Sequence, residues 1–237
     1  MINQTDTIEQ TDWSDFVEQL HKYFYEHAAE QCLLWVNPAQ ADPFNDDALV
    51  NEQRIRVPIS HRRFDVLLGP YLVPLDLSRS ADSDLLRASV EMAWDAWTPD
   101  HLEAMGGQPI SGWVATTEEP SALANHWAMR CHLHQQNGLS KFLRFHDPSV
   151  REWLWHSFTQ IQKRAVLGSA SRLFAIGRDQ ILLSHDAEES AYSPSQHAGE
   201  VAKLLPLKLD NLQWDQVHDY ATAHAAWVAW MLPLAEN

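Results

Sequence analysis

Short apolar runs alternate with longer segments of helical periodicity up to about residue 167, and this alternation restricts the folds open to the chain. The apolar runs have the length of strands and are bounded by Gly, Pro or Asn. The segments between them place apolar residues three and four positions apart, as amphipathic helices do. The pattern predicts a fold of the α/β to α+β class, in which helices flank a mixed, partly parallel sheet with crossover connections.

The boundaries of these elements can be estimated from the sequence. We expect strands at CLLWV (32–36), RFDVLL (63–68), YLVPLDL (71–77), ISGWVAT (110–116) and KFLRF (141–145), and a hairpin formed by RLFAI (172–176) and QILLS (180–184). We expect helices at about residues 12–30, 80–97, 120–136, 148–167 and 210–231. Residues 1–185 are predicted to form an α/β lobe, and residues 186–237 a smaller, mainly helical C-terminal lobe.

The charge of the chain limits its partners. The formal net charge is −15 at pH 7, so nucleic acid and anionic membrane surfaces should repel the protein. The longest nearly apolar run, residues 225–235, is too short to cross a bilayer, and the acidic N-terminal residues do not resemble a secretion signal. We therefore expect a cytoplasmic protein. Residues 139–178 are basic, with 7 bases and 2 acids, and we interpret them mainly as neutralising acidic neighbours in the same fold.

His146-Asp147 is the pair most suggestive of catalysis, since it lies between a predicted strand and a predicted helix. Asp147 directly precedes Pro148, and this order is typical of a capped helix start. We interpret Arg144, Asp147 and Pro148 as a structural motif in which Arg144 or Arg151 neutralises the carboxylate. A general base at His146 would need a neighbouring nucleophile or metal, and the sequence indicates neither. No catalytic residue is predicted.

The segment Cys131-His132-Leu133-His134 has the composition of a metal site. It falls within the predicted helix 120–136, where residues two positions apart point in directions about 200° apart. We therefore expect no metal there. The chain also lacks a Gly-rich phosphate loop, and no cofactor is predicted.

Tryptophan is unusually frequent, with 11 residues. Large aromatic side chains beside a core either extend that core or anchor a protein partner. In a chain without a predicted catalytic set, so many tryptophans favour a protein-binding surface. The predicted partner-binding residues are Trp153, Trp155 and Arg151 on the helix 148–167, and Trp230 on the final helix.

Two segments, LGPYLVPL (68–75) and FLRFHDPSVREWL (142–154), resemble the best-marked motifs of the type VI secretion effector adaptors, also called effector chaperones. CLLWVNPAQADPF (32–44) is similar to the opening strand of that family, and PSALANHWAMRCHLHQ (120–135) stands where the family has a helix. The resemblance covers roughly residues 30–170. Three positions depart from it: Asn37 stands where Asp is usual, His146 where Tyr is usual, and Ser149 where Arg is usual.

The resemblance implies a non-enzymatic cytoplasmic adaptor that binds a toxic effector protein and helps to load it onto VgrG, the spike protein of the secretion machine. Because the similarity ends near residue 170, we expect residues 186–237 to carry specificity for the cargo. Two other classes stay open at this point. One is an immunity-type protein that binds and blocks a toxin, and the other is a hydrolase that uses His146 and Asp147.

Overall fold

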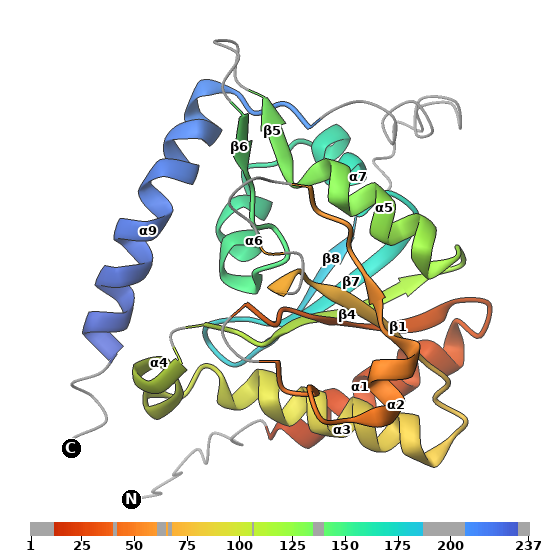
Figure 1. The fold of residues 1–237 in the computed structure, drawn as a ribbon. Coiled ribbons are helices and arrows are strands. Elements are labelled where there is room, and N and C mark those ends of the chain that lie inside the picture. Colours follow the sequence, from red (N-terminus) through yellow and green to blue (C-terminus); the bar gives the residue numbers. More distant parts are fainter. Residues whose placement is uncertain are drawn as a thin grey trace, which may run out of the picture.

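The computed structural model describes residues 12–39, 42–60, 65, 68–105, 107–134, 140–186 and 207–231 of the chain. A six-stranded sheet lies between two layers of helices (Figure 1). Its strands, in spatial order, are β2 (Ile55–Arg56), β3 (Tyr71–Leu75), β1 (Gln31–Val36), β4 (Ile110–Thr116), β7 (Ala170–Ile176) and β8 (Leu182–Asp186). The helices are α1 (Trp13–Glu26), α2 (Ala48–Gln53), α3 (Ser80–Asp95), α4 (Pro99–Met105), α5 (Pro120–Arg130), α6 (Pro148–Trp155), α7 (Gln160–Leu167) and α9 (Asn211–Met231). A separate hairpin consists of β5 (His132–His134) and β6 (Ser140–Phe142).

The strand pairings of the described sheet are all antiparallel. β1 lies between β3 and β4 and runs opposite to both, so β3 and β4 run in the same direction without being neighbours. The connection through α3 and α4 carries the chain from β3 past β1 to β4. The helix-covered sheet predicted from the sequence is confirmed. The expected parallel neighbours are absent from the described pairings, because this helical connection skips a strand.

The alternation of side chains along β1 divides the core into two clusters. Leu33 and Trp35 belong to the cluster beneath α5, α6 and α7. Cys32, Leu34 and Val36 belong to the cluster beneath α1 and α3. A strand covered on both faces reads as a continuous apolar run, which explains why β1 can be predicted from CLLWV.

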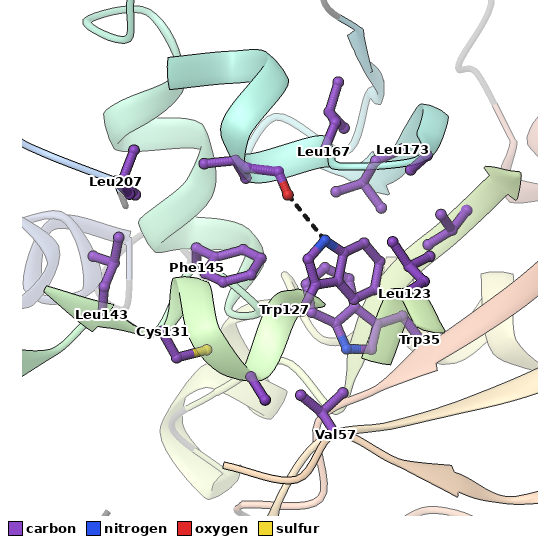
Figure 2. Close-up of a cluster of buried hydrophobic side chains, with 14 of the residues drawn as sticks. Trp35, Val57, Leu123, Trp127, Cys131, Leu143, Phe145, Leu167, Leu173 and Leu207 are labelled. Carbon is purple, nitrogen blue, oxygen red and sulfur yellow. Dashed lines mark hydrogen bonds between the residues drawn. The ribbon is translucent and has the colours of Figure 1, made fainter. Parts of the chain in front are cut away.

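The core beside α5 is built around two tryptophans (Figure 2). Trp35 of β1 and Trp127 of α5 stack with ring centroids 4.0 Å apart and planes inclined by 19°. The Trp127 indole N–H donates to the Val166 carbonyl, 2.9 Å away, and so ties α5 to the end of α7. Phe145 packs against both indole rings. Tryptophan in this region therefore fills the interior.

The helix predicted over residues 148–167 is wrong, because the segment forms two helices, α6 and α7. Thr159 starts α7 with a capping box: its hydroxyl accepts from the Gln162 N–H, and the Gln162 side chain accepts from the Thr159 N–H. These bonds satisfy backbone donors that a continuous helix would bond internally. The apolar periodicity crosses the break because both helices cover the same core. Ile161, which shares the helical spacing of the buried residues Leu154 and Phe158, is nevertheless 64% exposed.

The helix predicted over residues 120–136 ends at Arg130, and the residues after it form β5. β5 pairs with β6, so its backbone hydrogen bonds come from a neighbouring strand. His132 and His134 therefore lie on a strand, and the argument that they diverge on a helix is wrong. Within the described ranges, no three His, Cys, Asp or Glu side chains gather closely enough to hold a metal ion.

α9 runs along the side of the molecule and packs against α6 and α4 (Figure 1). Trp214, Val217 and Tyr220 pack against the core cluster beside α6, and Trp227 packs against the cluster beside α3. Of the lobe predicted over residues 186–237, the structure describes mainly this helix, and it contacts both clusters. The helices in the described part of the chain include none with the length and apolar character required to span a membrane.

Candidate functional site

The joint between β6 and α6 has the capping arrangement expected from its sequence. The Asp147 carboxylate accepts a hydrogen bond from the Ser149 backbone N–H at 3.0 Å, and Pro148 is the first residue of α6. The Arg144 guanidinium pairs with the second carboxylate oxygen, also at 3.0 Å. Of the two arginines considered for this pairing, Arg144 makes it, and Arg151 has other partners.

Replacing Asp147 by alanine should lower the free energy of unfolding by about 0.5–2 kcal/mol, because α6 loses its cap. Chemical denaturation measures the change. Asp147→Asn is the matched control, since asparagine also caps helices well. It gives up only the pairing with the half-exposed Arg144, which is worth less than about 1 kcal/mol. Equal losses in the two variants would show that the charge of Asp147, not its capping, stabilises the joint.

His146 is enclosed in the core beside this cap. Its side chain is 1% exposed, and burial, together with the positive charges of Arg144 and Arg151, lowers its pKa to about 3. The imidazole is therefore neutral at neutral pH. The ring lies against Phe142, with centroids 5.9 Å apart. The position at which the adaptor motif usually has tyrosine thus holds a buried aromatic contact in this chain.

Arg151 lies inside the joint, not on a surface. It is 2% exposed, and its guanidinium donates to the carbonyls of Phe145 in the joint and Ser111 in β4. The guanidinium also lies over the Trp35 ring, 5.6 Å from its centroid. Burial lowers the pKa of Arg151 to about 9, so the group stays charged at neutral pH. A side chain enclosed in this way links β4 to the joint. The prediction that Arg151 contacts a partner stays a prediction, and this burial does not favour it.

A chain of buried polar side chains leads from the start of α6 toward β1 and α3. The Ser149 hydroxyl donates to Gln108 Oε1 at 3.2 Å, and the Gln108 amide donates to the Ala96 carbonyl at 3.1 Å. The Asn37 amide donates to the Gln108 carbonyl at 3.2 Å. Two of the three departures from the adaptor motif, Asn37 and Ser149, therefore meet at Gln108. The residues usual at these two positions are Asp and Arg, which are charged, whereas Asn37 and Ser149 of this chain are neutral.

α9 covers the joint through hydrogen bonds to its backbone and side chains. The Trp153 indole N–H donates to the Gln216 carbonyl at 3.0 Å, and the Gln213 amide donates to the Ser157 carbonyl at 2.7 Å. Tyr220 of α9 is half-buried against the joint, and burial raises the pKa of its hydroxyl to about 12. α9 therefore packs against the helix that this motif begins, α6, and against the turn that follows it.

A series of aromatic contacts continues toward the end of α9. Tyr220 stacks on His224 at 5.5 Å, and His224 stacks on Trp227 at 6.0 Å. Trp227 meets the buried Trp97 edge-on at 5.7 Å, and the Arg178 guanidinium lies 5.4 Å from the Trp227 ring centroid. These contacts direct the aromatic residues of α9 toward the rest of the protein.

The tryptophans predicted to bind a partner do not form one exposed surface. Trp155 is buried beside Phe158 and His185, and Trp153 is half-buried beneath α9. Their contact with a partner stays a prediction, which the burial of Trp155 does not favour. The side chain of Trp230, near the end of α9, lies outside the described residues. Most tryptophans serve the interior: Trp35, Trp97, Trp113, Trp127 and Trp155 are buried, and Trp13, Trp94, Trp153, Trp214 and Trp227 are half-buried.

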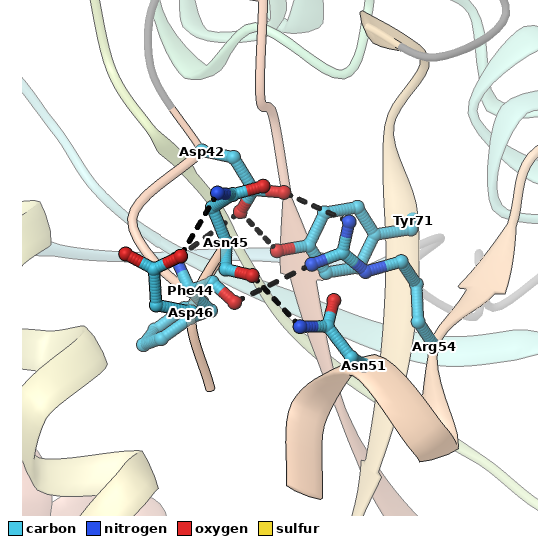
Figure 3. Close-up of polar contacts among 7 residues, drawn as sticks. All are labelled: Asp42, Phe44, Asn45, Asp46, Asn51, Arg54 and Tyr71. Carbon is cyan, nitrogen blue, oxygen red and sulfur yellow. Dashed lines mark hydrogen bonds and ion pairs between the residues drawn. The ribbon is translucent and has the colours of Figure 1, made fainter. Parts of the chain in front are cut away.

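The strand of the LGPYLVPL motif is fixed by a second polar cluster (Figure 3). The Tyr71 hydroxyl donates to the Asp42 carboxylate at 2.6 Å, and Arg54 forms an ion pair with the same carboxylate at 2.8 Å. The Arg54 guanidinium also lies 4.0 Å above the Tyr71 ring. α2, which the sequence patterns did not predict, begins nearby with Asp47 as its cap. The motif thus anchors the chain that follows β1 onto β3.

Comparison with known protein families gives a match over the middle of the chain. The family model described as Domain of unknown function (DUF4123) matches residues 66–165. No curated protein and no solved structure matches the chain. The matched segment runs from just before β3 into α7, and it contains the Tyr71 strand and the Asp147 joint. The family match therefore includes the Asp147 joint and, of the second polar cluster, Tyr71, whereas Asp42 and Arg54 precede it.

Proposed function

We propose that this protein is a cytoplasmic adaptor of a type VI secretion system, which binds an effector protein and helps to load it onto the VgrG spike. The observation that carries the proposal is the position of the family match. Residues 66–165 include the whole of the two segments that best resemble effector adaptors, LGPYLVPL and FLRFHDPSVREWL. Both segments build buried polar clusters, around Tyr71 and Asp147. Motifs of this kind suit a shared scaffold whose members hold different proteins.

We further propose that the protein acts without catalysis and without a cofactor. His146 is buried, and Asp147 is engaged as a helix cap and an ion-pair partner. Cys32 and Cys131 are free thiols, but burial raises the pKa of both far above neutral, which makes them poor nucleophiles. These contacts support a binding protein over a hydrolase that would use the joint.

Specificity for the cargo is proposed to come from residues 186–237. The family match ends at residue 165, so this segment lies beyond the shared part of the chain. Residues 179–237 contain 9 acids and 2 bases, and this charge suits a basic effector. Complementary charge of this kind speeds encounter more than it tightens a complex. Trp230 is the residue of this segment that we expect to contact the cargo.

Co-expression with a toxin and a VgrG protein from the same organism tests the adaptor proposal. An adaptor should form a complex in which the effector and VgrG co-purify only when the adaptor is present. Its deletion should stop export of the effector while VgrG is still secreted. An immunity protein would instead bind the effector alone and protect cells from it. A chain that binds neither protein is not an adaptor.

A further inference from the structure

An open groove of about 680 Å³ lies between the last turn of α1, the start of β1 and the end of β3. Phe24 and Leu75 are buried apolar residues of its lining, and Pro74 contributes a residue without a backbone N–H. Tyr25 also lines the groove and is 87% exposed. A groove of this size accommodates several side chains of a bound molecule.

The charges that line the groove are negative. Glu30 and Asp76 belong to the lining, and its described residues include no lysine or arginine. Arg79, which follows the lining residue Ser78, pairs with Asp82 of α3. Hydrogen bonds from the hydroxyl and backbone N–H of Ser78 hold the pKa of Asp76 below its usual value, so its carboxylate is ionised. Ala28, another lining residue, follows the C-terminal end of α1, where helix carbonyls carry a partial negative charge.

The surface around the groove is acidic as well. α1 and α3 pack side by side on the same face of the sheet (Figure 1). Exposed acids on these two helices are Asp15, Glu18, Glu26, Asp84 and Glu91, and their exposed bases are Lys22 and Arg87. An apolar groove within a negative surface favours a partner that is both basic and apolar.

We infer that this groove docks a segment of the effector in which lysine or arginine lies beside apolar side chains. The inference rests on the adaptor function proposed above. The apolar side chains of the segment contact Phe24, Leu75 and Tyr25, and its cationic groups lie near Glu30 and Asp76. Because α9 packs against α4 and α6, this contact is separate from that helix, the main described part of the C-terminal segment.

Isothermal titration of the full chain with the effector that co-purifies with it in the co-expression experiment tests this contact. Tyr25→Ala should raise the Kd at least about tenfold, as the loss of an aromatic anchor does. The melting temperature should not change, because Tyr25 is exposed. Met129→Ala is the matched control: it truncates a side chain that is 61% exposed, on α5 of the opposite layer, and the Kd should stay unchanged. An unchanged Kd for Tyr25→Ala would overturn the inference.

The charges are tested separately by the double substitution Glu30→Gln and Asp76→Asn. Both amides can still accept the hydrogen bonds now donated by Tyr23 and Ser78, so the fold should be kept. Association with the effector should become slower and less dependent on salt concentration. Unaltered association kinetics would contradict the role given to the acidic lining.

Two further arms separate failure of this inference from failure of the adaptor function. The same variants are titrated with VgrG, and a loss confined to VgrG would overturn the assignment to the effector. Short random peptides displayed on phage are selected on the unchanged protein and counter-selected on Tyr25→Ala. If the unchanged protein binds neither the effector nor VgrG, the adaptor proposal fails. The phage selection then tests by itself whether the groove binds basic, apolar segments. Enrichment of basic, apolar peptides upholds the inference, and no enrichment overturns it.

Discussion

Trp127→Ala should lower the free energy of unfolding by about 3–5 kcal/mol, the range typical of a tryptophan removed from a core. The Trp127 side chain is 1% exposed and stacks on Trp35, so alanine leaves a cavity between the sheet and α5 (Figure 2). The substitution also removes the hydrogen bond to the Val166 carbonyl, which joins α5 to α7. Urea denaturation followed by circular dichroism measures the loss.

Two variants show which part of Trp127 is responsible. Trp127→Phe keeps an aromatic ring but leaves the Val166 carbonyl without its donor, and we expect a smaller loss of about 1–3 kcal/mol. Met129→Ala changes an exposed side chain on the same helix, and its effect should stay within about 0.5 kcal/mol. If Trp127→Ala is no worse than Met129→Ala, the stacked pair is not the centre of this core.

The strands could be predicted where burial on both faces makes the sequence continuously apolar. ISGWVAT is such a run, and β4 occupies residues 110–116, as predicted. The break within residues 148–167 was missed because apolar periodicity reports only which face meets the core. What divides α6 from α7 is the capping box of Thr159 and Gln162. The spacing Thr-x-x-Gln is visible in the sequence and would have marked this second helix start.

The candidate site could be predicted only where its contacts are local. The cap at Asp147 involves its immediate neighbours, and the Asp-Pro order indicates it. Arg151 reaches Ser111, 40 residues away, and Ser149 reaches Gln108, 41 residues away. No spacing rule in one sequence connects such pairs. For the same reason, the frequency of tryptophan indicates large apolar contacts but does not separate core positions from a binding surface.

The ion pairs of the basic segment over residues 139–178 involve mainly its own acids. Ion pairs join Arg144 to Asp147, Arg172 to Asp186 and Arg178 to Glu152, at 3.0, 3.0 and 3.9 Å. Arg151 adds a cation that is fully enclosed. Asp147 and Glu152 belong to the segment itself and Asp186 lies outside it, so the interpretation that the segment neutralises acidic neighbours stays a prediction. The exposed acids of α1 and α3 have fewer exposed bases beside them, which is why the groove on that face suits a basic partner.

Gly112→Ala should have the second large effect, a loss of about 3–5 kcal/mol. Gly112 lies within β4 with φ of +140°, a conformation that other residues rarely adopt. A Cβ at this position would overlap the Phe174 backbone carbonyl of β7. No side-chain rotation relieves an overlap with backbone, so the two strands would have to separate. Denaturation in urea, as for Trp127→Ala, gives the size of the effect.

The position of Gly112 connects this effect to the candidate site. The pairing of β1 with β4 shifts register here, and such irregularities in a strand often require glycine. The preceding residue, Ser111, supplies a carbonyl that accepts from Arg151, so displacement of β4 should also disturb the joint beneath α9.

Gly177→Ala is the matched control for Gly112→Ala. A Cβ there meets only the end of the Leu183 side chain, at 2.8 Å, and that side chain can rotate away. We expect a loss below about 1 kcal/mol for this control. Equal losses for the two alanine variants would mean that the close approach of β4 to β7 at Gly112 is not what fixes the register of β4.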